Sequence, residues 1–230
     1  MHDFGKLAYL DVHKTGSSYV SDFLNTCCTL QQVRFSKHDW VREDYRQDCF
    51  YFITIRDPVD MWSSLYRFGL DKKGDVYSRL YKIGLLSKYE SFNSFVEFCL
   101  NEKNANLLGF DFNYEISKLI GFMSFRFLKL SLRYPMKQIR QCINNGLNLQ
   151  TLENNFITKL EIKNEKLDEG LINLSTKLYP EYFNAEKVSE YMHSNSKVNE
   201  SKISKYEIDS LSDKTLECLH HKESLLISRY

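Results

Sequence analysis

Two short apolar runs near the start of the chain each stop at a polar loop that leads into a helical pattern. Residues 6–12 form the first run, and apolar residues then recur at helical spacing over 19–24. Residues 49–55 form the second, a continuous stretch dominated by aromatic and β-branched side chains, which is typical of a strand covered on both faces. Two strand–loop–helix units of this kind predict an α/β fold with a central parallel sheet flanked by helices.

The loop after the first run is a candidate anion site. Lys14 supplies a positive charge. Small residues that offer hydroxyls and backbone N–H groups ahead of a helix follow it: Thr15, Gly16, Ser17 and Ser18. The triphosphate pattern G-x-x-x-x-G-K-[ST] is not met, because His13 precedes Lys14 and the upstream glycine is missing. The loop therefore predicts a phosphate or sulfate site, and a strand-to-helix turn capped by serines is the alternative.

Arg56 is the residue at which the second run stops. Asp57 is expected to cap the next helix and Pro58 to occupy its first position. Open α/β sheets bind ligands at the carboxyl ends of their strands. Ser64 follows Arg56 by eight residues, about two helical turns, so both side chains are predicted to meet one phosphate. An ion pair of Arg56 with a nearby aspartate and a plain surface serine are the alternatives.

The rest of the chain is mostly helical by its pattern. Residues 70–150 predict a helical insertion, and 154–162 predict a late strand followed by a helix near 168–178. Residues 185–205 are polar and rich in Ser, Asn and Lys, which indicates a surface loop that acts as a lid or substrate loop. A last helix is expected after Ser212. The length of 230 residues suits a single domain, 1–230.

Composition limits the partners that this chain can have. The net charge of +1 gives no general attraction to nucleic acid, and no apolar stretch reaches the roughly 18 residues of a membrane-spanning helix. The six cysteines show no CxxC pair and no His/Cys metal spacing, so we expect free thiols and no metal site. Free thiols favour a cytoplasmic protein. The initiating Met1 disfavours the alternative, a Golgi-lumenal catalytic domain cut from a membrane-anchored parent.

The two motifs together resemble those of the carbohydrate sulfotransferases that use 3′-phosphoadenosine 5′-phosphosulfate. The likeness is greatest to the 2-O-sulfotransferase-like branch and its bacterial relatives. It covers residues 14–18 and 56–59 with Ser64 and Tyr66, and is weaker over 156–169 and 198–202. Met61 departs from the family, which often has a second arginine at this position. The resemblance implies a P-loop-like, three-layer fold.

The resemblance also implies an activity, the transfer of a sulfuryl group from this donor to a hydroxyl of a carbohydrate. The first motif would bind the 5′-phosphosulfate, Arg56 and Ser64 the 3′-phosphate, and Lys202 would lie in a segment that closes over the nucleotide. Lys14 is then a candidate catalytic residue, because its charge can stabilise the bridging oxygen of the leaving phosphate. This chemistry requires no metal.

A hydroxyl acceptor needs a base, and His38 is the first candidate. It lies in a polar loop between the two motifs, where related sulfotransferases carry a histidine or a glutamate. Asp39 and Glu43 are the substitutes, and a plain surface histidine is the alternative interpretation. His13 is expected to position the loop. The other candidates are expected on the solvated surface: His193, His220 and His221.

The acceptor is the least constrained part of the prediction. Basic residues surround His38 and suggest an anionic carbohydrate as one hypothesis: Arg34, Lys37, Arg42 and Arg46. A second basic set is predicted on one helical stripe and is typical of a solvated face: Arg126, Lys129 and Arg133. Two other functions remain open, a small-molecule or nucleotide kinase with a degenerate phosphate loop and a non-catalytic nucleotide-binding domain.

Overall fold

The computed structural model describes residues 1–146, 148–195 and 208–230. Tertiary contacts divide this chain into two compact units. The N-terminal unit consists of Met1–Arg56, Leu130–Arg133 and Asn155–Ile203. The helical unit consists of Asp57–Lys129, Tyr134–Asn154 and Ser204–Tyr230.

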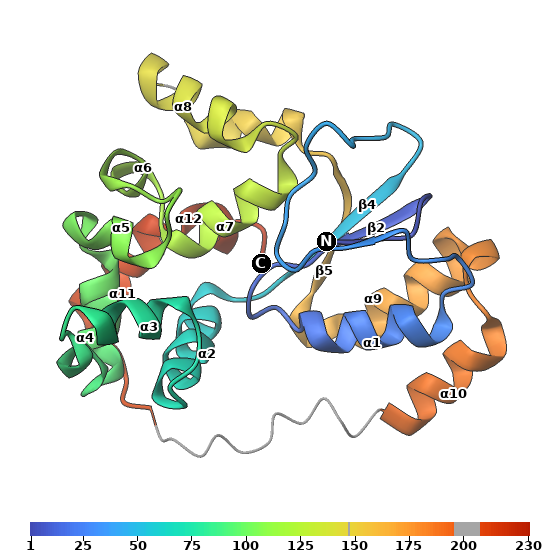
Figure 1. Ribbon diagram of the computed structural model, residues 1–230, viewed down its shortest axis with the longest axis horizontal. Helices are drawn as coiled ribbons and strands as arrows, with labels where there is room; N and C mark the ends of the chain where they lie inside the picture. The colour runs from blue at the N-terminus through green and yellow to red at the C-terminus, as the bar shows by residue number, and fades with distance from the viewer. Residues whose placement is uncertain (147, 196–207) are drawn as a thin grey trace. The chain divides into compact units, whose positions relative to one another are not determined.

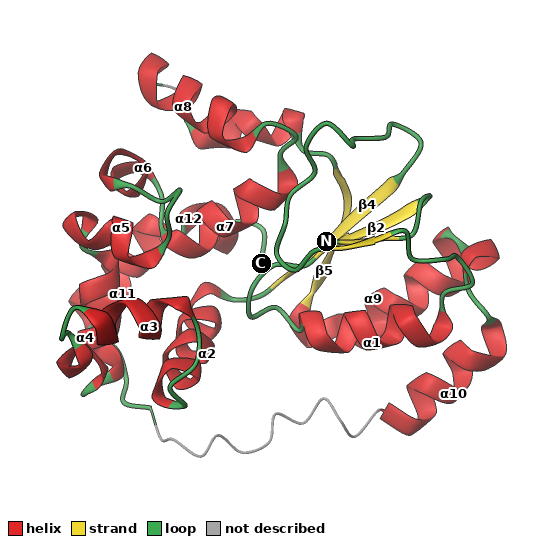
Figure 2. Ribbon diagram, in the orientation of Figure 1, coloured by secondary structure: helices red, strands yellow, loops and turns green. Residues whose placement is uncertain are grey.

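The N-terminal unit is built on a five-stranded sheet of order β3-β1-β2-β4-β5 (Figure 2). Its strands are β1 (His2–Asp3), β2 (Leu7–Leu10), β3 (Arg34–Phe35), β4 (Phe50–Ile55) and β5 (Thr158–Lys163). β2, β4 and β5 are parallel, whereas β1 pairs antiparallel with both β2 and β3. The prediction of a parallel sheet is therefore wrong for its β1–β3 edge, and the sheet is mixed. The short turn between β1 and β2 contains Gly5 at φ 80°, a conformation that glycine adopts without strain.

Two helices of the N-terminal unit cover one face of this sheet, and a third packs against the first of them (Figure 1). They are α1 (Ser17–Cys27), α9 (Leu167–Asn173) and α10 (Ala185–Asn195). Tyr9 of β2 stacks on Phe52 of β4 with ring centroids 5.0 Å apart, and Phe23 of α1 and Leu171 of α9 belong to the same buried cluster. Side chains alternate between the two faces of a strand, so Tyr9 and Phe52 point to the same face of the sheet. There they pack with α1, which comes early in the sequence, and with α9, which comes late.

The prediction of a surface loop over 185–205 is wrong for its first part. Residues 185–195 form α10, which packs on α1. Val188 and Tyr191 are buried, and the Tyr191 hydroxyl donates to Asp22 Oδ2 on α1 (2.9 Å). The polar residues of this segment form the exposed face of an amphipathic helix. Val188 and Tyr191, three positions apart, form its buried face. Residues 196–205 lie outside the described residues.

The helical unit contains the middle of the chain and its C-terminal part. Its helices are α2 (Pro58–Leu70), α3 (Asp75–Lys82), α4 (Phe92–Leu100), α5 (Ala105–Leu108), α6 (Tyr114–Leu119), most of α7 (Phe122–Ser131), α8 (Pro135–Asn145), α11 (Asp213–Lys222) and α12 (Ser224–Ile227). The predicted start of α2 is confirmed, because the Asp57 carboxylate accepts the N–H groups of Val59 (2.8 Å) and Asp60 (3.2 Å) and Pro58 is the first helical residue. Among the described helices, none has both the length and the apolar character needed to cross a membrane.

A buried carboxylate organises the core of the helical unit. Glu223, which is 0% exposed, accepts hydrogen bonds from Trp62 Nε1 (3.1 Å) and from the N–H groups of Met123 (3.1 Å) and Ser124 (2.7 Å). The last two groups belong to the first turn of α7, where a helix favours negative charge. Burial nevertheless raises the pKa of Glu223, and the hydrogen bonds oppose this only in part.

This raised pKa predicts a pH-dependent stability for the helical unit. A carboxyl whose pKa is higher in the folded state binds more protons there, so its stabilising contribution is complete below the ordinary pKa of 4.5 and is lost as the pH rises. We expect the free energy of unfolding of the wild type, minus that of Glu223→Gln, to fall with rising pH from about pH 4.5, by at most ~1.4 kcal/mol per pH unit. Urea unfolding between pH 4 and 8 measures it.

Glu217→Gln, which changes an exposed glutamate of α11, is the matched control for this experiment. A difference between wild type and Glu223→Gln that stays constant across the pH range would contradict the prediction.

Candidate functional site

The loop between β2 and α1 has two residues in the left-handed backbone region. Lys14 has φ 67° and Gly16 has φ 87°, and α1 begins directly after Gly16. A Cβ atom at Gly16 would lie 2.7 Å from Asn164 Nδ2 and 2.7 Å from Leu167 Cδ1, so both the backbone and the space require glycine. The predicted serine cap is wrong, because Gly16 occupies the capping position and no side chain caps the helix.

The N-terminus of α1 presents backbone donors. Within the described residues, the N–H groups of Gly16, Ser17 and Ser18 have no hydrogen-bond acceptor. Ser18 is exposed, and Lys14 and Ser17 are partly exposed. Unsatisfied N–H groups at a helix start carry a partial positive charge and favour an anion.

Thr15 differs from its neighbours because it is fully buried. Its hydroxyl donates to the Val12 carbonyl oxygen (2.9 Å) and lies 2.6 Å from Thr54 Oγ1, which lies 2.7 Å from the Tyr9 hydroxyl. Each hydroxyl has one proton, so the donors run in one order, from Tyr9 to Thr54 to Thr15 to Val12. The expectation that the Thr15 hydroxyl holds a sulfate oxygen is therefore not met: it fixes the loop, and burial raises the pKa of Tyr9 at the other end.

Arg56 follows β4 and reaches the same loop. Its Nη1 atom donates to the carbonyl oxygen of Lys14 at 3.4 Å. β4 is parallel to β2, so both strands end at the same edge of the sheet, the one formed by their carboxyl ends. The structure thus brings together the Lys14 loop and Arg56, which are 42 residues apart in the sequence.

His38 lies at this edge as well, in the loop after β3. Its backbone N–H donates to the Asp11 carboxylate, and its ring stacks on His13 with centroids 3.4 Å apart. His38 is partly exposed, whereas Asp11 is buried. The candidate base therefore contacts the residues that directly precede Lys14.

Two predicted site residues, Ser64 and Lys202, are not among the described residues of the N-terminal unit. Ser64 lies on α2, which belongs to the helical unit. Lys202 lies outside the described residues. Their roles stay predictions from the resemblance.

Two residues at the site escaped the sequence analysis as functional candidates. Asp11 holds His38, and Asn164, directly after β5, contacts Gly16 from the third parallel strand. A polar residue directly after a buried strand is the available signal, and it applies to Asp11. Nothing local distinguishes Asn164 from the other polar residues of its segment.

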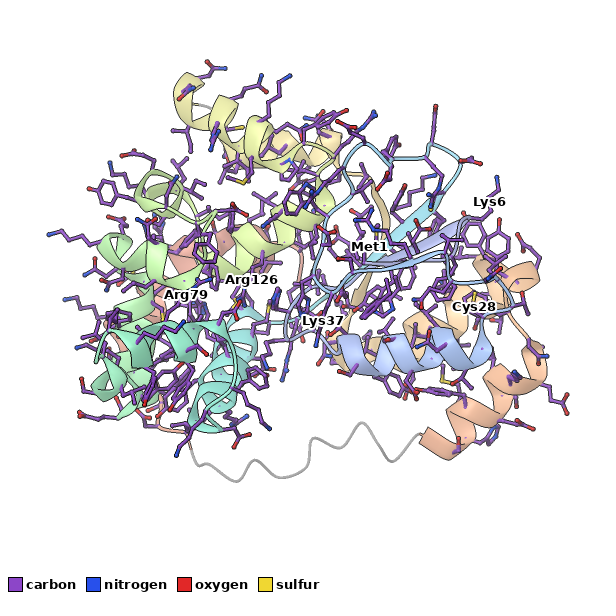
Figure 3. The ribbon with its side chains drawn as sticks, in the orientation of Figure 1. Met1, Lys6, Cys28, Lys37, Arg79 and Arg126 are labelled. Carbon is purple, nitrogen blue, oxygen red and sulfur yellow. The ribbon has the colours of Figure 1, made fainter. Side chains whose placement is uncertain are left out.

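The basic residues around His38 are mostly committed to carboxylates. Arg34 pairs with Asp39 (2.9 Å) and with Asp44, Arg42 reaches Asp39 (3.5 Å), and Arg46 pairs with Asp3 (2.5 Å). Asp39, a substitute base, is thereby held in ion pairs, while Glu43 is exposed. Lys37, which is labelled in Figure 3, is exposed and has no carboxylate partner among the described residues.

The second basic set is not one helical stripe. α7 ends at Ser131, before Arg133, and Lys129 pairs with Asp111 (2.5 Å). Arg126 lies over the Phe122 ring at 4.0 Å, and burial lowers its pKa to about 9. The prediction of a solvated face is therefore wrong at Arg126.

The other kinds of site that the predicted residues could form are a reactive thiol, a metal site and a pocket. All six cysteines are free, and burial raises the pKa of Cys27 to about 11, which keeps that thiol protonated. Within the described chain, no three His, Cys, Asp or Glu side chains are grouped to hold a metal ion. Hollows of about 440 Å³ at α4 and α11 and about 200 Å³ at α6 and α12 contain no predicted site residue.

Comparisons of this chain with protein-family models, with curated proteins and with solved structures found no match.

Gly16 provides a direct test of the loop geometry. Gly16→Ala should lower the free energy of unfolding by about 2–4 kcal/mol, because it combines a strained φ with overlap against Asn164 and Leu167. Gly5→Ala is the matched control, since Gly5 has φ 80° and open space around its Cβ position, and should cost only about 1–2 kcal/mol. Chemical denaturation measures both. Equal losses would show that the contact with Asn164 and Leu167 adds nothing.

Proposed function

We propose that the N-terminal unit binds 3′-phosphoadenosine 5′-phosphosulfate and transfers its sulfuryl group to a hydroxyl of a carbohydrate. The observation that supports this most is the contact of Arg56 Nη1 with the Lys14 carbonyl oxygen. This contact brings the second motif next to the first at one edge of the sheet. A sulfate donor that carries an anionic group at each end requires both motifs close together.

Each loop residue has a distinct task in this proposal. The N–H groups of Gly16, Ser17 and Ser18 hold the non-bridging oxygens of the phosphosulfate at the start of α1. The buried Thr15 hydroxyl keeps these donors in place without touching the ligand. Lys14 supplies the mobile charge, and Arg56 binds the 3′-phosphate.

The transfer is an in-line displacement at sulfur. The acceptor oxygen forms a bond to sulfur while the bond from sulfur to the bridging phosphate oxygen breaks. Lys14 stabilises the negative charge that grows on this bridging oxygen. His38 takes the proton of the acceptor hydroxyl. The products are a sulfate ester and 3′,5′-adenosine bisphosphate.

The acceptor side of the proposal centres on Lys37. Arg34, Arg42 and Arg46 pair with carboxylates, whereas Lys37, which directly precedes His38, has no carboxylate partner among the described residues and can meet an acidic group. A carbohydrate with a carboxylate or sulfate near the reacting hydroxyl fits this arrangement. Lys37→Ala should raise KM for an anionic acceptor several-fold and leave KM for the sulfate donor unchanged, because an exposed ion pair contributes up to about 1 kcal/mol. Steady-state kinetics with matched neutral and anionic acceptors checks this.

Ligand binding tests the proposed donor site. 3′,5′-Adenosine bisphosphate at 100 times its Kd should raise the melting temperature by roughly 5–10 °C, whereas ATP with magnesium should not. An equal response to ATP would favour the kinase. Lys14→Ala should retain part of the bisphosphate stabilisation.

Turnover tests the catalytic role of Lys14. Lys14→Ala should lower kcat by about 10²–10³-fold in an assay that detects sulfated glycans by mass spectrometry. Lys177→Ala, an exposed lysine of the same unit, is the control. Full activity in Lys14→Ala would refute the catalytic claim.

A further inference from the structure

Asp11 occupies the junction between β2 and the Lys14 loop. Its side chain is only 1% exposed. Both carboxylate oxygens lie 3.0 Å from the backbone nitrogen of His38 and accept its N–H. His38 has φ 56°, a left-handed conformation that is costly for a residue other than glycine. The carboxylate therefore stabilises a strained turn that aims the histidine.

The imidazole ring of His38 makes a second contact with the same residue. Nδ1 lies 2.7 Å from the backbone carbonyl oxygen of Asp11 and 3.3 Å from its Oδ2. A carbonyl oxygen only accepts, so Nδ1 carries the proton in the neutral ring. The lone pair is then on Nε2, the arrangement that a general base needs.

His13 restricts the remaining freedom of this ring. The two imidazoles are nearly parallel, with 21° between their planes and 3.4 Å between their centroids. Other charged groups near Asp11 and His38 are the Met1 amino group, which lies 2.5 Å from Asp11 Oδ1, and the side chains of His2 and Lys37. Within the part of the chain that the structure describes, the Asp11 carboxylate thus faces several positive or titratable groups.

We infer that Asp11 is a positioning residue for His38. The Asp11 backbone carbonyl fixes the tautomer of the His38 ring, and the Asp11 carboxylate stabilises the protonated form of that ring. The inference rests on the proposed function, in which His38 accepts the proton of the acceptor hydroxyl. It adds to that function the residue that prepares the base.

The tautomer is tested without any activity measurement. Two-bond ¹H–¹⁵N spectra of the wild-type protein labelled with ¹⁵N-histidine distinguish the two neutral forms, and His38→Gln identifies the signals of His38. We expect the proton on Nδ1. A neutral His38 with its proton on Nε2 overturns the inference, whether or not the protein transfers sulfate.

Asp11→Asn tests the carboxylate, since asparagine keeps the shape and one acceptor for the His38 N–H. The His38 titration midpoint in the same spectra should move to lower pH, because the charge that stabilises the imidazolium is lost. With sulfate donor and acceptor, kcat should fall roughly 10- to 100-fold, part of the 10²–10⁴ that a general base supplies, while the KM for the donor changes little. The acid limb of the kcat profile should move with the NMR midpoint.

Asp44→Asn, an exposed carboxylate of the same loop that pairs with Arg34, is the matched control and should leave the His38 titration and kcat unchanged. An unchanged His38 titration in Asp11→Asn overturns the carboxylate's role. If Asp11→Asn does not fold, the wild-type tautomer still decides the carbonyl contact, and Asp11→Glu, which keeps the charge, should retain the wild-type midpoint. If the wild type neither binds the bisphosphate nor transfers sulfate, the proposed function is refuted. The inference about Asp11 and His38 is then still decided by the spectra, which require neither ligand nor activity.

Discussion

A chain of buried hydroxyls joins β2, β4 and the Lys14 loop, and the geometry of the candidate site depends on it. Tyr9 donates to Thr54, Thr54 to Thr15 and Thr15 to the Val12 carbonyl oxygen. Leaving one buried hydroxyl without a partner costs about 1–3 kcal/mol, so each group holds the next in place. Because Arg56 follows Thr54 by two residues, fixing Thr54 against the loop also brings the Arg56 guanidinium to the Lys14 carbonyl.

The two units use a helix N-terminus in opposite ways. At the start of α7, the buried Glu223 carboxylate accepts the N–H groups of Met123 and Ser124, so this end is filled by the chain itself. At the start of α1, the N–H groups of Ser17 and Ser18 have no acceptor within the described residues. The same physical property, a partial positive charge at a helix start, stabilises the core in one unit and leaves a place for an anion in the other.

Charge at the candidate site is arranged locally, in a chain whose net charge is only +1. Most arginines near His38 are neutralised by aspartates, which removes a general attraction for anions. Arg56 donates to the Lys14 carbonyl oxygen, and the buried Asp11 carboxylate accepts the N–H of His38. The segment after β2 therefore carries a buried negative group at Asp11 and a positive group at Lys14, three residues apart.

The sequence by itself determined the elements that depend on neighbouring residues. Apolar runs predicted β2 and β4, and the Asp57-Pro58 pair predicted the start of α2, because strand burial and helix capping involve residues only a few positions apart. Only the tertiary structure decided the antiparallel edge of the sheet, the burial of Thr15, and the approach of Asp11 to His38 and of Asn164 to Gly16. The last two contacts join residues 27 and 148 positions apart in the sequence, and local periodicity carries no information about which distant groups will satisfy a buried polar atom.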